Sequence, residues 1–442
     1  MKFNKVKLVI IMILIVGMIL PTYSFAANEA NMTETKEDVF QNITAPNLLL
    51  ANTDSGKILY ERNANEKIYP ASVTKLMTAI LVVENCKMND IVTVSQNAIK
   101  IVPSGYVNAS LRAGEKLTVE NLLNVMLIPS ANDAANALAE HVGGTIEKFA
   151  IMMNNKAKEI GCTGSNFNNP SGLHEDNHYT TTKDLLLISK EAIKNNTIKT
   201  IIGKTTYTLP KSNKYNRIDR IFTTTNYLKR KELNKYYYQY CIGAKTGYTG
   251  EAKNCVIEYA SKENLNLTAI VMGENGKIKG TKFLDAKKMF EYGFSRYENR
   301  LIVKKDEIFE NLKITNATKE TRNLETIYKS NINIIVNKDK KLEIINWKDV
   351  DNNSDEYIMK KVEYIKTKAP ILKGDIIGKV TYKYDGMEYS TEIIANGNVE
   401  KSELLQQILL VGSIVLIILI IYFLIKSKRK GTKNKKKYIE YS

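Results

Sequence analysis

The chain has 442 residues, 44% of them hydrophobic, and a formal net charge of +17, which is enough sequence for two or three domains with a substantial core. More than half of the net charge lies at the two ends, in three lysines near the N-terminus and eight basic residues near the C-terminus. The remainder forms no basic stripe, so the charge pattern disfavours a nucleic-acid partner and favours membrane topology.

Residues 1–26 have the order of a secretory signal peptide. Lysines at positions 2, 5 and 7 precede an apolar run, and Ser24-Phe25-Ala26 supplies a small-x-small cleavage site. The alternative is an uncleaved membrane anchor, and in either form the following chain is exported. Residues 27–43 are polar and predict a leader linker.

Residues 44–300 predict an α+β domain. Strand patterns occur at both ends of this range and helical periods fill its middle, which predicts an antiparallel sheet with an inserted helical lobe. Residues 301–400 change to short strands and turns, as expected for a smaller β-sandwich-like domain. The expected strands of the first domain are 45–51, 57–61, 236–245, 255–260 and 267–272, and its main helices start near 70, 119, 134, 145, 184 and 279.

Residues 404–425 predict a transmembrane helix, because an uncharged apolar run ending at Ile425 is long enough to cross a bilayer. Residues 426–442 form a basic tail. The positive-inside rule places this tail in the cytoplasm and the long middle of the chain outside the cell membrane, with a single C-terminal anchor. A nucleic-acid-binding tail is the alternative, which its position next to the apolar run disfavours.

Four cysteines are few for an exported chain of this size, and their spacing predicts neither a metal cluster nor a dense disulfide framework. Cys241 and Cys255 flank an expected hairpin, and the sequence leaves open whether they form a disulfide. We expect no metal ion and no cofactor.

A serine and a lysine three residues apart open the first long helix. Pro70 fits a helix start, and Ser72 and Lys75 then share one face. The helix is apolar on nearly every side, so Lys75 is expected to be buried, with a lowered pKa that lets it accept a proton from the hydroxyl of Ser72. The alternative is a buried helix start with a snorkelling lysine.

Two further motifs follow. Ser130 and Asn132 stand in a break between helices, where they can serve as a proton relay and a substrate amide contact; Ser130 can equally be the N-cap of the next helix. Lys245-Thr246-Gly247 lies on an expected strand and offers a cation, a hydroxyl and a close backbone approach to an anionic group, unless it is only a strand end before a turn.

The order Ser-x-x-Lys, Ser-x-Asn, Lys-Thr-Gly is that of serine penicillin-recognising enzymes. Over roughly residues 45–395 the chain resembles the low-molecular-mass penicillin-binding proteins that are serine D-alanyl-D-alanine carboxypeptidases. The stretches that carry the resemblance are Tyr69-Pro-Ala-Ser-Val-Thr-Lys-Leu-Met-Thr-Ala79, Asn169-Pro-Ser-Gly-Leu173, Gly243-Ala-Lys-Thr-Gly-Tyr-Thr249 and Ala369-Pro-Ile-Leu-Lys-Gly374.

The resemblance implies a β-lactamase/transpeptidase-like catalytic domain that removes the terminal D-Ala from peptidoglycan stem peptides ending in D-Ala-D-Ala and is inhibited by β-lactam antibiotics. It assigns Ser72 as the acylated nucleophile, Lys75 as its base and Ser130 as proton relay. The substrate-binding residues would be Asn132, Lys245, Thr246, Gly247 and Tyr248, with the N–H groups of Ser72 and Tyr248 as the oxyanion hole. Many relatives end in an amphipathic surface helix, from which the apolar run here departs.

Three alternatives compete with this function. His174-Glu175-Asp176-Asn177-His178 matches a zinc-protease motif, which requires a helix, but it follows a Pro-Ser-Gly loop. A β-lactamase would need a deacylating carboxylate, for which Glu175 and Asp176 are the candidates, in no recognisable setting. A non-catalytic peptidoglycan-binding or scaffold protein would need neither Ser72 nor Lys75.

Overall fold

The computed structural model describes residues 40–439 apart from 277, 279 and 348–355. The chain divides into two compact units, Met1–Ile43 and Thr44–Ser442, and all elements discussed below belong to the second. The expected signal peptide and most of the leader linker lie outside the described residues.

The first of the two predicted domains is built on a five-stranded antiparallel sheet of order β2-β1-β9-β8-β7. Its two central neighbours, β1 and β9, come from opposite ends of the region, as the sequence predicted. Leu48, Leu49 and Leu50 of β1 are completely buried, because this strand is covered on both faces. The strands are β1 (Asn47–Asn52), β2 (Ile58–Arg62), β7 (Cys241–Thr249), β8 (Lys253–Lys262) and β9 (Leu265–Glu274).

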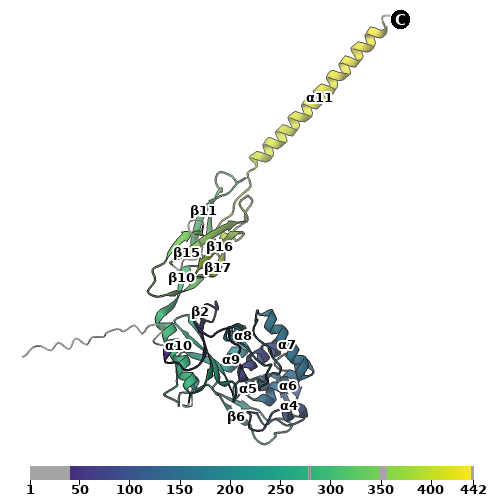
Figure 1. Cartoon of the computed structure of the whole chain (residues 1–442). Helices are drawn as coiled ribbons and strands as arrows, with labels where there is room; N and C mark the ends of the chain where they lie inside the picture. The colour runs from purple at the N-terminus through teal and green to yellow at the C-terminus, as the bar shows by residue number, and fades with distance from the viewer. Residues whose placement is uncertain (1–39, 277, 279, 348–355, 440–442) are drawn as a thin grey trace, which may run out of the picture. The chain divides into compact units, whose positions relative to one another are not determined.

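A helical lobe is inserted between β2 and β7, and its helices pack around α3. Figure 1 shows helices α4 to α9 of this lobe grouped together. Helix α3 is apolar on nearly all sides and buried over most of its length, as expected for the central helix of a lobe. The lobe's helices are α3 (Lys75–Asn85), α4 (Gln96–Lys100), α5 (Val119–Leu127), α6 (Asn132–Gly143), α7 (Ile146–Glu159), α8 (Thr182–Lys194) and α9 (Asn196–Ile202).

Two small two-stranded antiparallel sheets complete the lobe, formed by β3 (Ile91–Thr93) with β4 (Lys116–Thr118) and by β5 (Thr206–Leu209) with β6 (Arg220–Thr223). The sequence patterns did not resolve these strands, because three or four residues are too few to establish a period. After the sheet, α10 (Thr281–Arg296) packs on β8 and β9. It lies a few residues later than predicted, since the left-handed Gly280 precedes its first turn.

The following residues form two sheets around one core, which confirms the predicted β-sandwich-like domain. A six-stranded sheet has the order β11-β12-β17-β16-β15-β14, and β10 pairs with β13. Side chains of both sheets, among them Ile334 and Val380, share one buried cluster. The strands are β10 (Tyr297–Val303), β11 (Ile308–Lys313), β12 (Asn323–Tyr328), β13 (Ile332–Asn337), β14 (Glu343–Asn346), β15 (Tyr357–Tyr364), β16 (Ile376–Tyr384) and β17 (Met387–Ala395), so the expected boundary at 300 falls inside β10.

The last element is α11 (Leu404–Ile439), a single continuous helix. Its segment Gln407–Ser427 has 21 residues, is apolar and is exposed throughout, so its length and composition suit a membrane span. This agrees with the predicted anchor at 404–425.

The sequence left open whether Cys241 and Cys255 form a disulfide, and the sheet register keeps these two residues apart. Cys241 lies opposite Ala260, and Cys255 lies opposite Gly247. All four cysteines of the chain are among the described residues, and all are free thiols. The Cys241 thiol instead donates to Glu258 Oε2 at 3.4 Å.

We therefore predict that the chain unfolds at the same denaturant concentration with and without reductant, because no disulfide restricts the unfolded state. Denatured, unreduced protein should react with a thiol reagent at four positions. Two reactive thiols after denaturation would contradict the register.

Candidate active site

Ser72 lies in a short 3-10 turn, Ala71–Thr74, that leads directly into α3. The sequence predicted a helix beginning at Pro70, but Pro70 is the N-cap of this tighter turn. In 3-10 geometry side chains three residues apart eclipse one another, so the turn points Ser72 Oγ and Lys75 Nζ at each other, 2.9 Å apart.

Lys75 is completely buried, and its Nζ has three oxygens within hydrogen-bond distance. Besides Ser72 Oγ, these are Asn132 Oδ1 and the Ser171 carbonyl oxygen, both at 2.6 Å. The last two can only accept hydrogen bonds. A neutral amine has two hydrogens, which these two acceptors take up, and its lone pair is then left facing the hydroxyl of Ser72.

Burial lowers the pKa of Lys75 well below that of a free lysine, and the nearby positive charge of Lys245 lowers it further; Asp133 acts in the opposite direction. The neutral amine is therefore accessible without any other base. This arrangement can remove a proton from Ser72 and make its oxygen nucleophilic.

The loop at 169–172 holds this pair through backbone hydrogen bonds, a role that the sequence motifs alone did not assign. Ser171 provides the carbonyl to Lys75, and Pro170 accepts a hydrogen bond from Thr78 Oγ1 at 2.6 Å. Gly172 has φ of +80°, and a Cβ there would lie 1.9 Å from the Ala71 oxygen, so only glycine fits.

Ser130 reaches the site from the loop before α6, and Asn132 reaches it from the first position of that helix. The N-cap of α6 is Ala131, without a side-chain cap bond, so Ser130 does not serve as the cap. Ser130 instead has a left-handed φ of +72°, strained for a residue with a side chain, and it accepts a hydrogen bond from Lys245 Nζ at 2.8 Å. Asn132 begins α6 and holds Lys75.

Lys245 and Thr246 come from the edge strand β7. Lys245 is completely buried, and its Nζ also donates to the Thr246 carbonyl at 2.8 Å. Burial, together with Lys282, lowers the pKa of Lys245 to about 7. Thr246 Oγ1 lies 2.6 Å from Thr225 Oγ1, so its hydroxyl is oriented beside the cleft.

Gly247 allows β7 to approach the serine turn. A Cβ at this position would lie 2.9 Å from the backbone nitrogen of Ser72 and 3.0 Å from Ala71 Cβ. Any side chain would therefore separate the strand from the nucleophile. The close approach brings the backbone N–H groups of Ser72 and of the strand to the same cleft, where they can stabilise a negative oxygen.

These groups border a cleft of about 600 Å³, within the usual range for ligand sites. Tyr248 lines it with its exposed side chain. Two cations that sequence reasoning missed also line it: Arg230, and Lys282, whose Nζ donates to the Gly247 carbonyl at 3.3 Å. Among the described lining residues there is no carboxylate, so the cleft favours an anionic ligand. No local motif in the sequence marks either cation as part of the cleft.

The zinc-protease motif does not form a zinc site. His174 and His178 lie in a loop rather than on one helix face. His178 is buried with its Nδ1 accepting from the Asn168 backbone and its Nε2 3.0 Å from Thr74 Oγ1, and burial lowers its pKa to about 3. This histidine is a neutral structural residue that positions the serine turn.

The two carboxylates considered for a β-lactamase, Glu175 and Asp176, are not placed to act in the cleft. Glu175 accepts hydrogen bonds from the side-chain amides of Asn169 and Asn168, at 2.7 and 3.1 Å. Within the described part of the chain, neither Glu175 nor Asp176 is among the residues lining the cleft. The geometry thus offers no deacylating carboxylate.

Comparisons with known proteins agree with this geometry. Residues 31–276 match the D-alanyl-D-alanine carboxypeptidase family of peptidases. The chain is 31% identical over 398 residues, 88% of this chain and 92% of the relative, to the D-alanyl-D-alanine carboxypeptidase DacF of Bacillus subtilis (strain 168). It is 28% identical over 380 residues, 82% of this chain and 87% of the relative, to DacC of Escherichia coli (strain K12).

Solved structures show the same similarity. Penicillin-binding protein 5 from Haemophilus influenzae is 25% identical with a TM-score of 0.61, covering 81% of this chain and 98% of its own. A variant of the Streptomyces K15 DD-transpeptidase is 29% identical with a TM-score of 0.53, covering 57% of this chain and 98% of its own.

The buried charge of Lys245 predicts a pH-dependent stability. Below pH 7 the lysine is charged in both states and its burial costs stability; between about 7 and 10.5 only the unfolded state keeps the proton, so the unfolding free energy rises with pH. We expect Lys245→Met to unfold with roughly 1–4 kcal/mol more free energy than the parent at pH 6, an advantage that shrinks toward pH 10. Denaturant titrations at several pH values measure this difference in unfolding free energy, with Lys158→Met, at an exposed position, as the control. A difference between Lys245→Met and the parent that does not change with pH would contradict the lowered pKa of Lys245.

Proposed function

The chain belongs to the D-alanyl-D-alanine carboxypeptidase family, and on that premise we propose that Ser72 is the serine acylated by its substrate. The chain is a serine peptidase of peptidoglycan metabolism and a penicillin-binding protein. The observation that carries the assignment is the buried Lys75 amine, 2.9 Å from Ser72 Oγ and otherwise surrounded by acceptors. A scaffold protein would gain nothing from this buried pair.

Acylation begins with the transfer of the Ser72 proton to Lys75. The serine oxygen then forms a bond to the carbonyl carbon between the two D-alanines, and the peptide bond breaks in the resulting tetrahedral intermediate. Asn132 Oδ1 and the Ser171 carbonyl hold the ammonium that Lys75 becomes, so the proton transfer needs no rearrangement of its partners.

The substrate is a peptidoglycan stem peptide ending in D-Ala-D-Ala. Its terminal carboxylate binds between Lys245 Nζ and the hydroxyl of Thr246, and Lys282 adds positive charge at the same end of the cleft. The amide of Asn132 contacts the peptide on the other side of the serine. β-lactam antibiotics carry the same combination of acyl carbonyl and carboxylate, which accounts for inhibition by acylation of Ser72.

The oxyanion that forms during attack receives hydrogen bonds from the backbone N–H groups of Ser72 and Tyr248. This role is supported by the approach of β7 to the serine turn at Gly247. One donor comes from the helix start and the other from the strand, and both are fixed before the substrate binds. Preorganised donors of this kind typically contribute about 10²–10³ in rate.

Ser130 donates its hydroxyl proton to the nitrogen of the leaving D-alanine and takes up in exchange the proton that Lys75 received from Ser72, so that Lys75 is again a neutral amine. Its oxygen accepts from Lys245, so its own hydrogen remains available to donate to the leaving nitrogen. Water then attacks the acyl-enzyme and gives a proton to the neutral Lys75. The ester bond to Ser72 Oγ breaks, Lys75 returns the proton to that oxygen, and the shortened stem peptide is released.

We also propose that the catalytic domain faces the cell wall and that α11 crosses the cell membrane once, with the basic tail inside. Export by residues 1–26, the apolar segment of α11 and the lysines that follow it support this topology.

The function is tested by incubating the full chain with labelled penicillin and with a pentapeptide ending in D-Ala-D-Ala, with and without chelator. We expect a long-lived adduct and D-Ala release that resists chelation, both lost in Ser72→Ala. Ser427→Ala, in the chain's second Ser-x-x-Lys sequence, is the matched control and should retain both. Rapid penicillin turnover would instead indicate a β-lactamase, and labelling of Ser72→Ala would overturn the nucleophile.

Lys75→Arg tests whether the amine must become neutral. A guanidinium keeps the positive charge but does not release a proton near neutral pH, so we expect the acylation rate to fall by roughly 10²–10⁴ while binding of the substrate carboxylate persists. The rate of penicillin labelling and the thermal melting point measure this. A nearly unchanged rate would mean that Lys75 acts only as a cation.

A further inference from the structure

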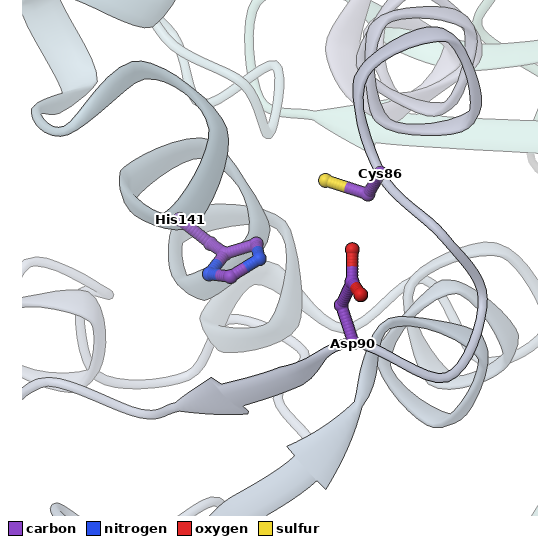
Figure 2. A group of neighbouring side chains, drawn as sticks. All are labelled: Cys86, Asp90 and His141. Atoms are coloured by element: carbon purple, nitrogen blue, oxygen red, sulfur yellow. The ribbon is translucent and has the colours of Figure 1, made fainter.

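A second group of reactive side chains lies at the other end of the helical lobe. The sulfur of Cys86, a carboxylate oxygen of Asp90 and a ring nitrogen of His141 all lie within 4.8 Å of one another. Figure 2 shows the three side chains converging from α6 and from the loop that follows α3. We call them the Cys86–Asp90–His141 cluster.

The chemistry of the cluster suits a zinc ion. Thiolate, imidazole and carboxylate are its usual protein ligands, at about 2.3, 2.1 and 2.1 Å. Tetrahedral angles then place neighbouring ligand atoms about 3.6 Å apart. Small side-chain rotations therefore suffice to close the cluster around an ion, with water in the fourth position.

The backbone around the cluster is already fixed. Cys86 is the C-cap of α3, and its N–H donates to the Val82 carbonyl. Asp90 Oδ2 accepts from the Lys87 backbone N–H at 2.8 Å, which orients the carboxylate and leaves its other oxygen for an ion. Hydrogen bonds of this kind around the ligands are a regular feature of metal sites.

The cluster is also open to solvent. Cys86 and Asp90 are half-buried and His141 is exposed, so an ion can enter without unfolding. The other three cysteines of the chain are buried. Two helices, α3 and α6, end at the cluster, and the partial negative charge of helix C-termini favours a cation there.

We propose that the Cys86–Asp90–His141 cluster binds one Zn²⁺, with release of the Cys86 thiol proton to solvent. The ion ties together the far ends of α3 and α6, the helices whose first residues are Lys75 and Asn132. Lys75 lies about 15 Å away along α3, so the zinc stabilises the lobe and takes no part in peptide hydrolysis.

Metal titration of the full, zinc-free chain tests the site directly. We expect one equivalent of Zn²⁺ to bind, and Co²⁺ in its place to give a thiolate-to-cobalt absorption band. Cys86→Ser and His141→Ala should each weaken binding at least about tenfold. His174→Ala removes the other partly exposed histidine and is the control, with unchanged affinity. Binding that survives His141→Ala, or is lost in His174→Ala, would overturn the proposal.

Thiol protection and stability give independent readings. Zn²⁺ should slow alkylation of Cys86 in the native protein, and at about 100 times its dissociation constant it should shift the folded-to-unfolded ratio about 100-fold. Neither effect should occur in Cys86→Ser, whose D-Ala release without metal should equal that of the parent. No protection and no shift in the parent chain would refute a zinc site while leaving the peptidase assignment intact.

Discussion

The burial of the Lys75 amine is the constraint on which the rest of the site depends. A lysine removed from water loses its preference for the charged form, and here each of its three possible hydrogen-bond directions meets an oxygen. Two of those oxygens can only accept. The environment therefore determines both the protonation state of the amine and the direction in which its lone pair points, which is toward Ser72.

Maintaining that environment requires three separate parts of the chain. The apolar α3 brings Lys75 into the core, the loop at 169–172 supplies the Ser171 carbonyl, and α6 supplies the Asn132 side chain. Glycines at 172 and 247 permit backbone approaches that no side chain would allow. The strained φ of Ser130 belongs to the same arrangement, because it turns that hydroxyl toward Lys245.

The cations of the cleft divide into two kinds. Lys75 and Lys245 are completely buried and have lowered pKa values, and the value of about 7 for Lys245 makes the charge of that lysine respond to pH near neutrality. Arg230 is only half-buried and lines the cleft itself. Since the described residues lining the cleft include no carboxylate, a substrate carboxylate meets uncompensated positive charge, which favours a peptide with a free C-terminus over an internal segment.

The sequence by itself determined the class of the fold, the three motifs and their order, because periodicity and short-range spacing are local properties. It also indicated the apolar C-terminal helix. Tertiary structure decided what depends on contacts between distant segments. The Ser171 carbonyl and Lys282 carry no local signature, Ser130 was equally compatible with a helix cap, and the separation of Cys241 from Cys255 follows from a strand register set across the whole sheet. The spacing of Ser72 and Lys75 is visible in the sequence, but the buried environment that we propose activates Ser72 exists only after folding.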